Sequence, residues 1–173
     1  MILYNNAFDL YHTIFRLLHL LKKSPPSKRI EVDRLRIWDF YLLFPSQIFS
    51  IKPKRHEKEF KELIKELNVK KENPYQKVYD QRKTLEKIRP YQMAALNCLA
   101  SYKIIDKALL VDGVVSIISE DILKDYVGSI GDLSSREINI ISIVTSVFYD
   151  ISLTGENGLK MRTNLIESKY DAK

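Results

Sequence analysis

Apolar side chains recur every three or four positions over much of this chain, the spacing of one face of an α-helix. Between residues 7 and 21 they widen beyond a single stripe, so we expect this first helix to lie centrally in the fold. Further helices are predicted at about residues 32–43, 57–67, 74–88, 90–102, 119–126, 134–151 and 159–170. The pattern therefore predicts a mainly α protein.

Prolines and capping residues set the predicted ends of these helices. Pro45 should end the second helix, and Asn73-Pro74 has the order of a cap followed by a first-turn proline. Arg89-Pro90 predicts a break and restart, because an internal proline removes a hydrogen bond and clashes with the preceding turn. Ser134 and Glu137 form a capping box that should open the long helix.

The period changes at residues 108–118, where β-branched and apolar residues flank Asp112-Gly113. That dipeptide between such runs predicts a β-hairpin. Two helices followed by a hairpin have the order of a winged helix; the alternative is a helical domain with an incidental hairpin. We predict one compact domain over 1–173, with N-terminal helices in 1–72, a winged-helix-like unit in 73–119 and C-terminal helices in 120–173.

Composition fits a folded intracellular protein. The 173 residues suffice for one core, and 45% hydrophobic with 29% charged residues argues against disorder. The longest apolar segment contains charged residues and is short for a bilayer span, so no membrane association is expected. Cys98 is the sole cysteine and no cationic leader follows Met1, so we expect a cytoplasmic location.

A formal charge of +6 permits nucleic-acid contact without requiring it. The outward face of the predicted fifth helix is poor in arginine, and Asp112 at the wing tip would repel phosphate, so sequence-specific reading is disfavoured. The candidates for phosphate contacts to double-stranded DNA are Lys52, Lys54, Arg55, Lys58, Arg82 and Lys83. The alternative is that these basic residues form a solvated face whose charge is balanced by neighbouring glutamates.

No known catalytic motif is present. The chain has no Gly-rich phosphate loop, nucleophile elbow or zinc-protease helix. His12 and His19 lie seven residues apart without a third ligand at metal spacing, and Cys98 lies beside alanines as a core residue would. We therefore predict no catalytic residue, no metal, no cofactor and no enzymatic activity.

Two apolar segments are candidates for partner binding. Residues 46–53 are irregular yet contain Ile48, Phe49 and Ile51, and the predicted tail helix is amphipathic. Its candidate contact residues are Leu159, Arg162 and Leu165. The alternative is that these side chains complete the domain's own core.

Several stretches in order resemble a known family. They are Asn5-Asn6-Ala7-Phe8 before a leucine-rich helix, Asp33-Arg34-Leu35 with Asp39-Phe40 and Leu42, Gln92 with Ala95-Leu96 and Leu99, and a tail of Gly158-Leu159-Lys160, Arg162-Thr163, Leu165 and Tyr170-Asp171. Together they resemble the middle component of ABC-type three-component bacterial defence systems, which include the small middle subunit of Lamassu systems.

The resemblance implies a small non-catalytic partner of an SMC-like ABC ATPase that also contacts an effector, often a nuclease. Such a subunit would bridge the DNA-sensing ATPase and the effector. Two other hypotheses remain: a winged-helix DNA-binding regulator, and a small enzyme whose site assembles only in space.

Overall fold

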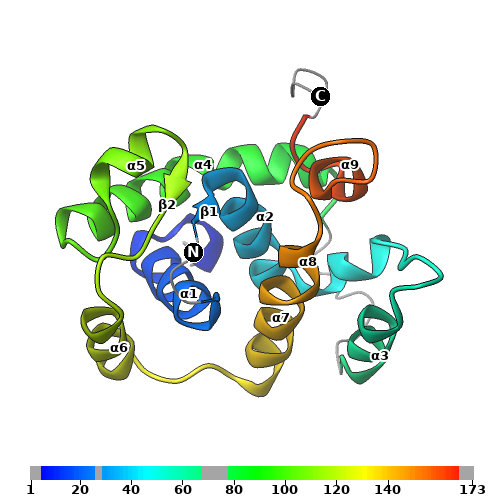
Figure 1. Ribbon diagram of the computed structural model, residues 1–173, viewed down its shortest axis with the longest axis horizontal. Helices are drawn as coiled ribbons and strands as arrows, with labels where there is room; N and C mark the ends of the chain where they lie inside the picture. Colours follow the sequence, from blue (N-terminus) through cyan, green and yellow to red (C-terminus); the bar gives the residue numbers. More distant parts are fainter. Residues whose placement is uncertain (1–4, 26–28, 68–77, 168–173) are drawn as a thin grey trace.

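The computed structural model describes residues 5–25, 29–67 and 78–167. Among these residues the chain is mainly helical, which confirms the predicted class (Figure 1). The elements in chain order are η1 (Asn6–Phe8), α1 (Leu10–Lys23), β1 (Ile30–Glu31), α2 (Val32–Leu43), η2 (Pro45–Ser50), α3 (Lys58–Glu66), α4 (Gln81–Ser101), α5 (Lys107–Val111), β2 (Val114–Val115), α6 (Glu120–Ser129), α7 (Ser135–Thr145), α8 (Val147–Asp150) and α9 (Leu159–Thr163).

Helix α2 is enclosed by other helices. Ten of its twelve residues are buried, on every side of the helix, and it packs against α1, α4 and α7. Helix α1 contacts α2, α4, α6 and α7, as its wide apolar face predicts. The buried apolar residues form one cluster that extends in sequence from Ala7 to Leu165. Within the described part of the chain, no helix has both the length and the apolar character needed to cross a bilayer.

Local capping explains where several helices begin. The Asp9 side chain accepts a hydrogen bond from the His12 backbone N–H and starts α1. Ser134 and Glu137 form both bonds of the predicted capping box and start α7. The predicted long helix then divides at Ser146 into α7 and α8. The Asn73-Pro74 start and the end of the tail near residue 170 lie outside the described residues.

The predicted break at Arg89-Pro90 is wrong, because α4 runs through Pro90 from Gln81 to Ser101. An internal proline costs about 3 kcal/mol. Helix α4 buries Leu85 and Ile88 before Pro90, and it buries Ala95 and Leu96 after it. Packing on both sides of the proline offsets the cost and keeps the helix continuous.

The predicted hairpin at 108–118 does not form between neighbouring strands. Residues 107–111 are the helix α5, whose N-cap Asp106 accepts bonds from the N–H groups of Ala108 and Leu109. Strand β2 follows a turn at Gly113, where φ is +77°, and pairs antiparallel with β1, far away in sequence. The register places Ile30 opposite Val115. The described residues of 73–119 therefore do not form the two helices and local wing that we predicted.

Candidate functional site

A buried ionic network surrounds α2. Asp39 is fully buried and accepts hydrogen bonds from Nε of Arg16 at 2.5 Å and from Nη2 of Arg16 at 3.3 Å. The Gln92 amide donates a third bond to this carboxylate at 2.8 Å. Arg16 also donates to the Thr13 hydroxyl at 3.1 Å. These bonds join α1, α2 and α4 in the interior of the molecule.

A second arginine continues the network along α2. Arg36 is buried and its Nε donates to Oε1 of Gln92 at 3.2 Å. Its terminal nitrogens contact Asp33 at 3.2 Å and Glu86 at 3.1 Å. The guanidinium therefore has partners on both α2 and α4, and its charge is compensated where it leaves the core.

A third arginine holds the C-terminal segment against α2. Nη1 of Arg34 donates to the carbonyl oxygens of Phe148 and Ile151 at 2.6 and 2.9 Å, and Nε bonds to Glu31 at 2.7 Å. Burial raises the pKa of Glu31, but the hydrogen bonds from Arg34 and from the backbone, together with the charges of Arg34 and Lys160, outweigh it. The pKa of Glu31 therefore lies below its ordinary value. Lys160 adds an ion pair with Asp33 at 3.0 Å.

Several residues from the stretches that carry the family resemblance belong to this network. Asp33, Arg34, Asp39, Gln92 and Lys160 were noted in the sequence as parts of those stretches, and all of them form bonds of this network. A signal was present, because charged residues interrupt apolar runs in the segments that became α1 and α2. Their pairing across helices is a property of the fold.

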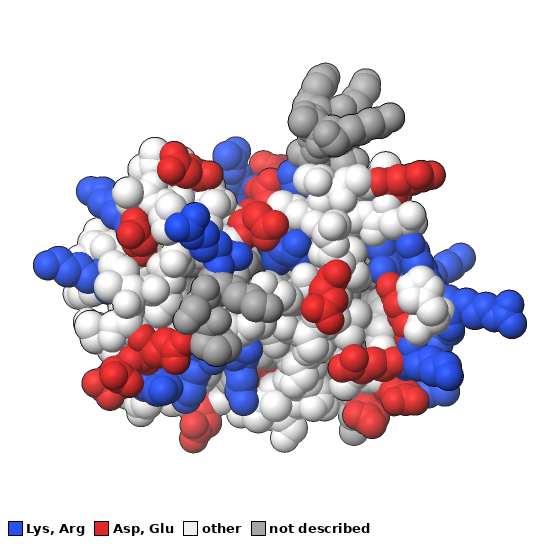
Figure 2. Space-filling model, viewed as in Figure 1, with Lys and Arg blue, Asp and Glu red and all other residues white. Residues whose placement is uncertain are grey.

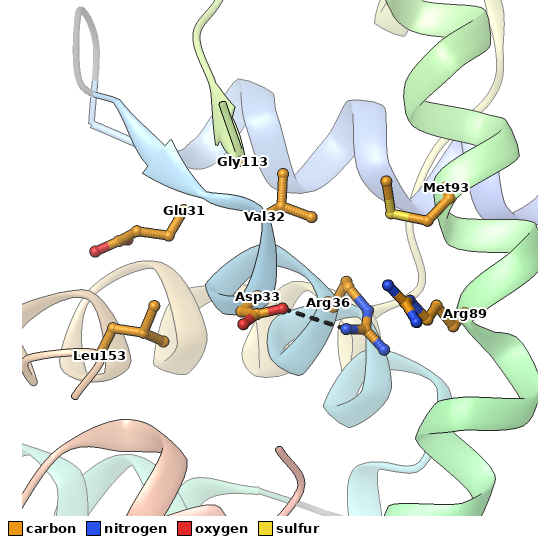
Figure 3. Close-up of a pocket in the computed structure, with 8 residues that line it drawn as sticks. All are labelled: Glu31, Val32, Asp33, Arg36, Arg89, Met93, Gly113 and Leu153. Carbon is orange, nitrogen blue, oxygen red and sulfur yellow. Dashed lines mark hydrogen bonds and ion pairs between the residues drawn. The ribbon is translucent and has the colours of Figure 1, made fainter. Parts of the chain in front are cut away.

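A pocket of about 300 Å³ opens beside the network, between β1, the start of α2, the middle of α4 and the turn before β2 (Figure 3). Val32, Met93 and Leu153 supply apolar lining, while Glu31 and Asp33 are held by the arginines and Lys160. Arg89 projects beside Arg36 in Figure 3. The remaining lining residues are Arg36 and Gly113. The pocket is mixed in charge, and its carboxylates already have partners.

The residues predicted to bind partners lie mainly inside the protein. Ile48, Ile51, Leu159 and Leu165 are buried in the core. Phe49 is half-buried against that core. These apolar side chains complete the domain's own interior, the alternative considered for them above. The tail helix is also shorter than predicted, because α9 ends at Asn164 in a left-handed conformation.

Arg162, the remaining predicted partner-binding residue, forms an internal ion pair. Its two terminal nitrogens donate to the two carboxylate oxygens of Glu57 at 2.6 and 2.8 Å. The bidentate bond from Arg162 lowers the pKa of Glu57 below its ordinary value. This pair ties α9 to the segment that precedes α3.

The predicted phosphate-contacting residues divide between two places. Lys52, Lys54, Arg55 and Lys58 lie in the segment 52–58, which we call the basic loop; all are exposed except Lys54, which is half-buried. The only carboxylate of this loop is Glu57, which Arg162 neutralises. Figure 2 shows Lys and Arg side chains gathered at this end of the molecule. The other two predicted residues, Arg82 and Lys83, are exposed in the first turn of α4.

An exposed apolar surface lies on α6 and was not predicted. Its members, which we call the α6 patch, are Tyr102, Ile118, Ile122 and Tyr126, with exposed fractions of 66%, 55%, 40% and 37%. The rings of Tyr102 and Tyr126 lie 6.3 Å apart. The residues come from the end of α4, a connecting segment and α6, so no single periodic pattern reveals them.

No group of three or more histidine, cysteine or acidic side chains that could hold a metal occurs among residues 5–25, 29–67 and 78–167. His19 lies in the core, where its ring contacts the Gly131 carbonyl at 3.1 Å, and burial lowers its pKa. Cys98 is half-buried on α4.

The fold and the site together define a small helical protein with a charged interior and two contrasting exposed surfaces. The chain belongs to the family described as ABC-three component (ABC-3C) system Middle Component 5, whose family model matches residues 2–171. This confirms the resemblance to a middle component, and membership of a multi-component system implies protein partners. Comparisons with curated proteins and with solved structures found no match.

Proposed function

We propose that this chain is a non-catalytic bridging subunit of an anti-phage defence complex of the Lamassu type. It links an SMC-like ABC ATPase to an effector nuclease. One observation carries the proposal beyond family membership: the basic loop with α3 and the α6 patch lie at opposite ends of the longest axis of the molecule (Figure 1). Two surfaces of different chemistry suit two different partners.

The buried network supports this role by fixing how the two ends are arranged. Hydrogen bonds from three arginines join α1, α2, α4 and the segment 148–151. Arg162 then connects α9 to the basic loop. Fully paired polar networks rigidify a core. A bridge made this way transmits the position of one partner to the other without a flexible joint.

The proposed absence of catalysis is supported by the state of the charged side chains at the pocket. Glu31 and Asp33 accept bonds from basic residues, and a carboxylate held in such pairs is a poor general base. The basic loop is proposed to contact DNA through phosphate groups alone, since exposed lysines on a loop provide charge without base readout.

Co-expression with the products of the two neighbouring genes tests the bridging proposal. Affinity-tagged chain should retain both proteins at moderate salt, one of them a coiled-coil ATPase. The same purification from cells that lack either neighbour should still retain the other, because the chain binds each partner by its own surface. Failure to retain any ATPase would overturn the proposal.

DNA binding separates this function from that of a DNA-binding regulator. We expect weak binding of equal strength to duplexes of different sequence, weakened steeply by salt. Replacing Lys52, Arg55 and Lys58 by glutamine should make the plot of log affinity against log salt less steep. The magnitude of its slope should fall by about one for each phosphate that is no longer bound. Replacing Lys103, Lys107 and Lys124 by glutamine is the matched control. Discrimination between sequences would favour the regulator instead.

A further inference from the structure

The α6 patch is held in place by backbone structure beneath it. Ile122 and Tyr126 are four residues apart in α6 and share its outer face, while Leu123 and Val127 turn into the core. The Ile118 N–H bonds to the Ile104 carbonyl at 3.0 Å, which places Ile118 beside the end of α4. The patch therefore rests on rigid elements with its apolar side chains outward.

Acidic residues outnumber basic ones in the segment that carries this patch. Residues 101–132 contain three lysines and six aspartates or glutamates, a net charge of −3 in a chain whose total is +6. Glu120, Asp121 and Asp125 are exposed on α6 itself. Figure 2 shows acidic side chains over α6, with basic ones beside them, and basic side chains gathered together with acidic ones at the end that carries α3.

We propose that the α6 patch binds an amphipathic helix of another component of the system, one that carries lysine or arginine beside its apolar stripe. This inference rests on the proposed function, which supplies the partner. Clustered exposed tyrosine and isoleucine are typical of interaction sites, and tyrosine is enriched among the residues that dominate binding energy. An apolar face set among carboxylates matches a helix with an apolar stripe flanked by positive charge.

The same charges argue against other occupants. Phosphates of nucleic acid and anionic lipid headgroups would both be repelled by Glu120, Asp121 and Asp125. A second copy of this chain would offer the basic loop, whose exposed residues are charged and lack an apolar stripe. A basic amphipathic helix is the one occupant that uses both the apolar centre and the acidic border.

Two substitution pairs test the two halves of this recognition in the co-expressed complex. Ile122→Ser with Tyr126→Ser removes the apolar centre, and Asp121→Lys with Asp125→Lys reverses the border. Each pair should lower retention of one component by about tenfold or more. Glu156→Lys with Glu167→Lys, exposed residues on other segments, makes the same change in charge and should retain the component as wild type does.

Stability measurements distinguish a loss of partner binding from a loss of folding. All four α6 positions are exposed, so circular dichroism should show variants that are folded as wild type is. Thermal unfolding should show a small loss of stability at most, expected for Asp121→Lys because Asp121 lies in the first turn of α6. If wild type retains no component, the proposed function fails. If wild type retains its partners and both α6 pairs do so equally well, only the present inference is overturned.

Photocrosslinking identifies the occupant directly. A benzophenone amino acid at position 126, in the co-expressed complex, should crosslink to a helical segment of another component that is rich in lysine or arginine. Glu156 is the matched control position and should give no such crosslink. Crosslinks to DNA, to a second copy of this chain or to an acidic segment would each refute the proposal.

Discussion

Replacement of Asp39 by asparagine should lower the free energy of unfolding by about 3–5 kcal/mol, the cost of breaking a buried ion pair. The Asp39 carboxylate is fully buried and lies 2.5 Å from Nε of Arg16, whose side chain is 5% exposed. Asparagine keeps the shape of aspartate but leaves this guanidinium without a counter-charge in the core.

The magnitude follows from the bonds at this position. Asp39 accepts two bonds from Arg16 and one from Gln92. Asparagine has one acceptor oxygen, and its NH2 group must face a donor of Arg16 or Gln92. Each buried polar group left without a partner costs about 1–3 kcal/mol. The total free energy of unfolding of a typical domain is about 5–15 kcal/mol, so a loss of this size should be readily measurable.

Urea unfolding followed by fluorescence of Trp38, the only tryptophan and a fully buried one, measures the effect. Arg16→Met alone should also be costly, because it strands the carboxylate. The double variant should lose less than the two single losses added together, with a coupling of about 0.5–3 kcal/mol. Asp125→Asn on the exposed face of α6 is the control, expected to change stability by about 0.5 kcal/mol at most. A loss below about 1 kcal/mol for Asp39→Asn, or strict additivity, would refute the reasoning.

Three further predictions concern stability. Tyr41→Phe should be neutral or raise the free energy of unfolding by about 1 kcal/mol in urea titrations, because the buried Tyr41 hydroxyl has no hydrogen-bond partner among the described residues. Gly158→Ala should lower the melting temperature, since an added Cβ would collide with the backbone of the preceding turn, whereas Gly128→Ala in helix α6 has open space and should raise it. Arg162→Met should lower the free energy of unfolding most at pH values above 4.5, the ordinary pKa of Glu57. Because Arg162 lowers this pKa in the folded state, the stability difference between the variant and wild type should shrink as the pH falls through the lowered pKa in acid unfolding experiments.

Much of the helical framework could be predicted because its signals are local. The capping box at Ser134 and the apolar periodicity of α1 and α2 needed only neighbouring residues. The hairpin prediction failed because Asp106 caps a short helix and β2 finds its partner at β1, a pairing decided by tertiary packing. The predicted break at Pro90 failed for the same reason: proline disfavours a helix interior locally, but packing on both sides of it keeps α4 continuous.

The candidate site could likewise be predicted from the sequence only in part. Exposure of the basic loop agrees with its composition, since clustered cations seldom enter a core. Burial of Ile48 and Leu159 could not be separated from partner binding by sequence, because both uses require an apolar side chain. The Arg16–Asp39 pair joins residues 23 positions apart, and the α6 patch joins separate segments, so spacing along the chain reveals neither.

The enclosure of α2 also bears on how such a protein changes over time. A substitution at Asp39, Arg36 or Arg34 disturbs bonds to α1, α4 or the C-terminal segment, so change there requires matching changes elsewhere. Glu57 of the basic loop pairs with Arg162, but the exposed lysines and arginine of the loop and the side chains of the α6 patch form none of the bonds described for the network around α2. Relatives should therefore share the buried network around α2, while the basic loop and the α6 patch diverge, each changing together with the partner that it binds.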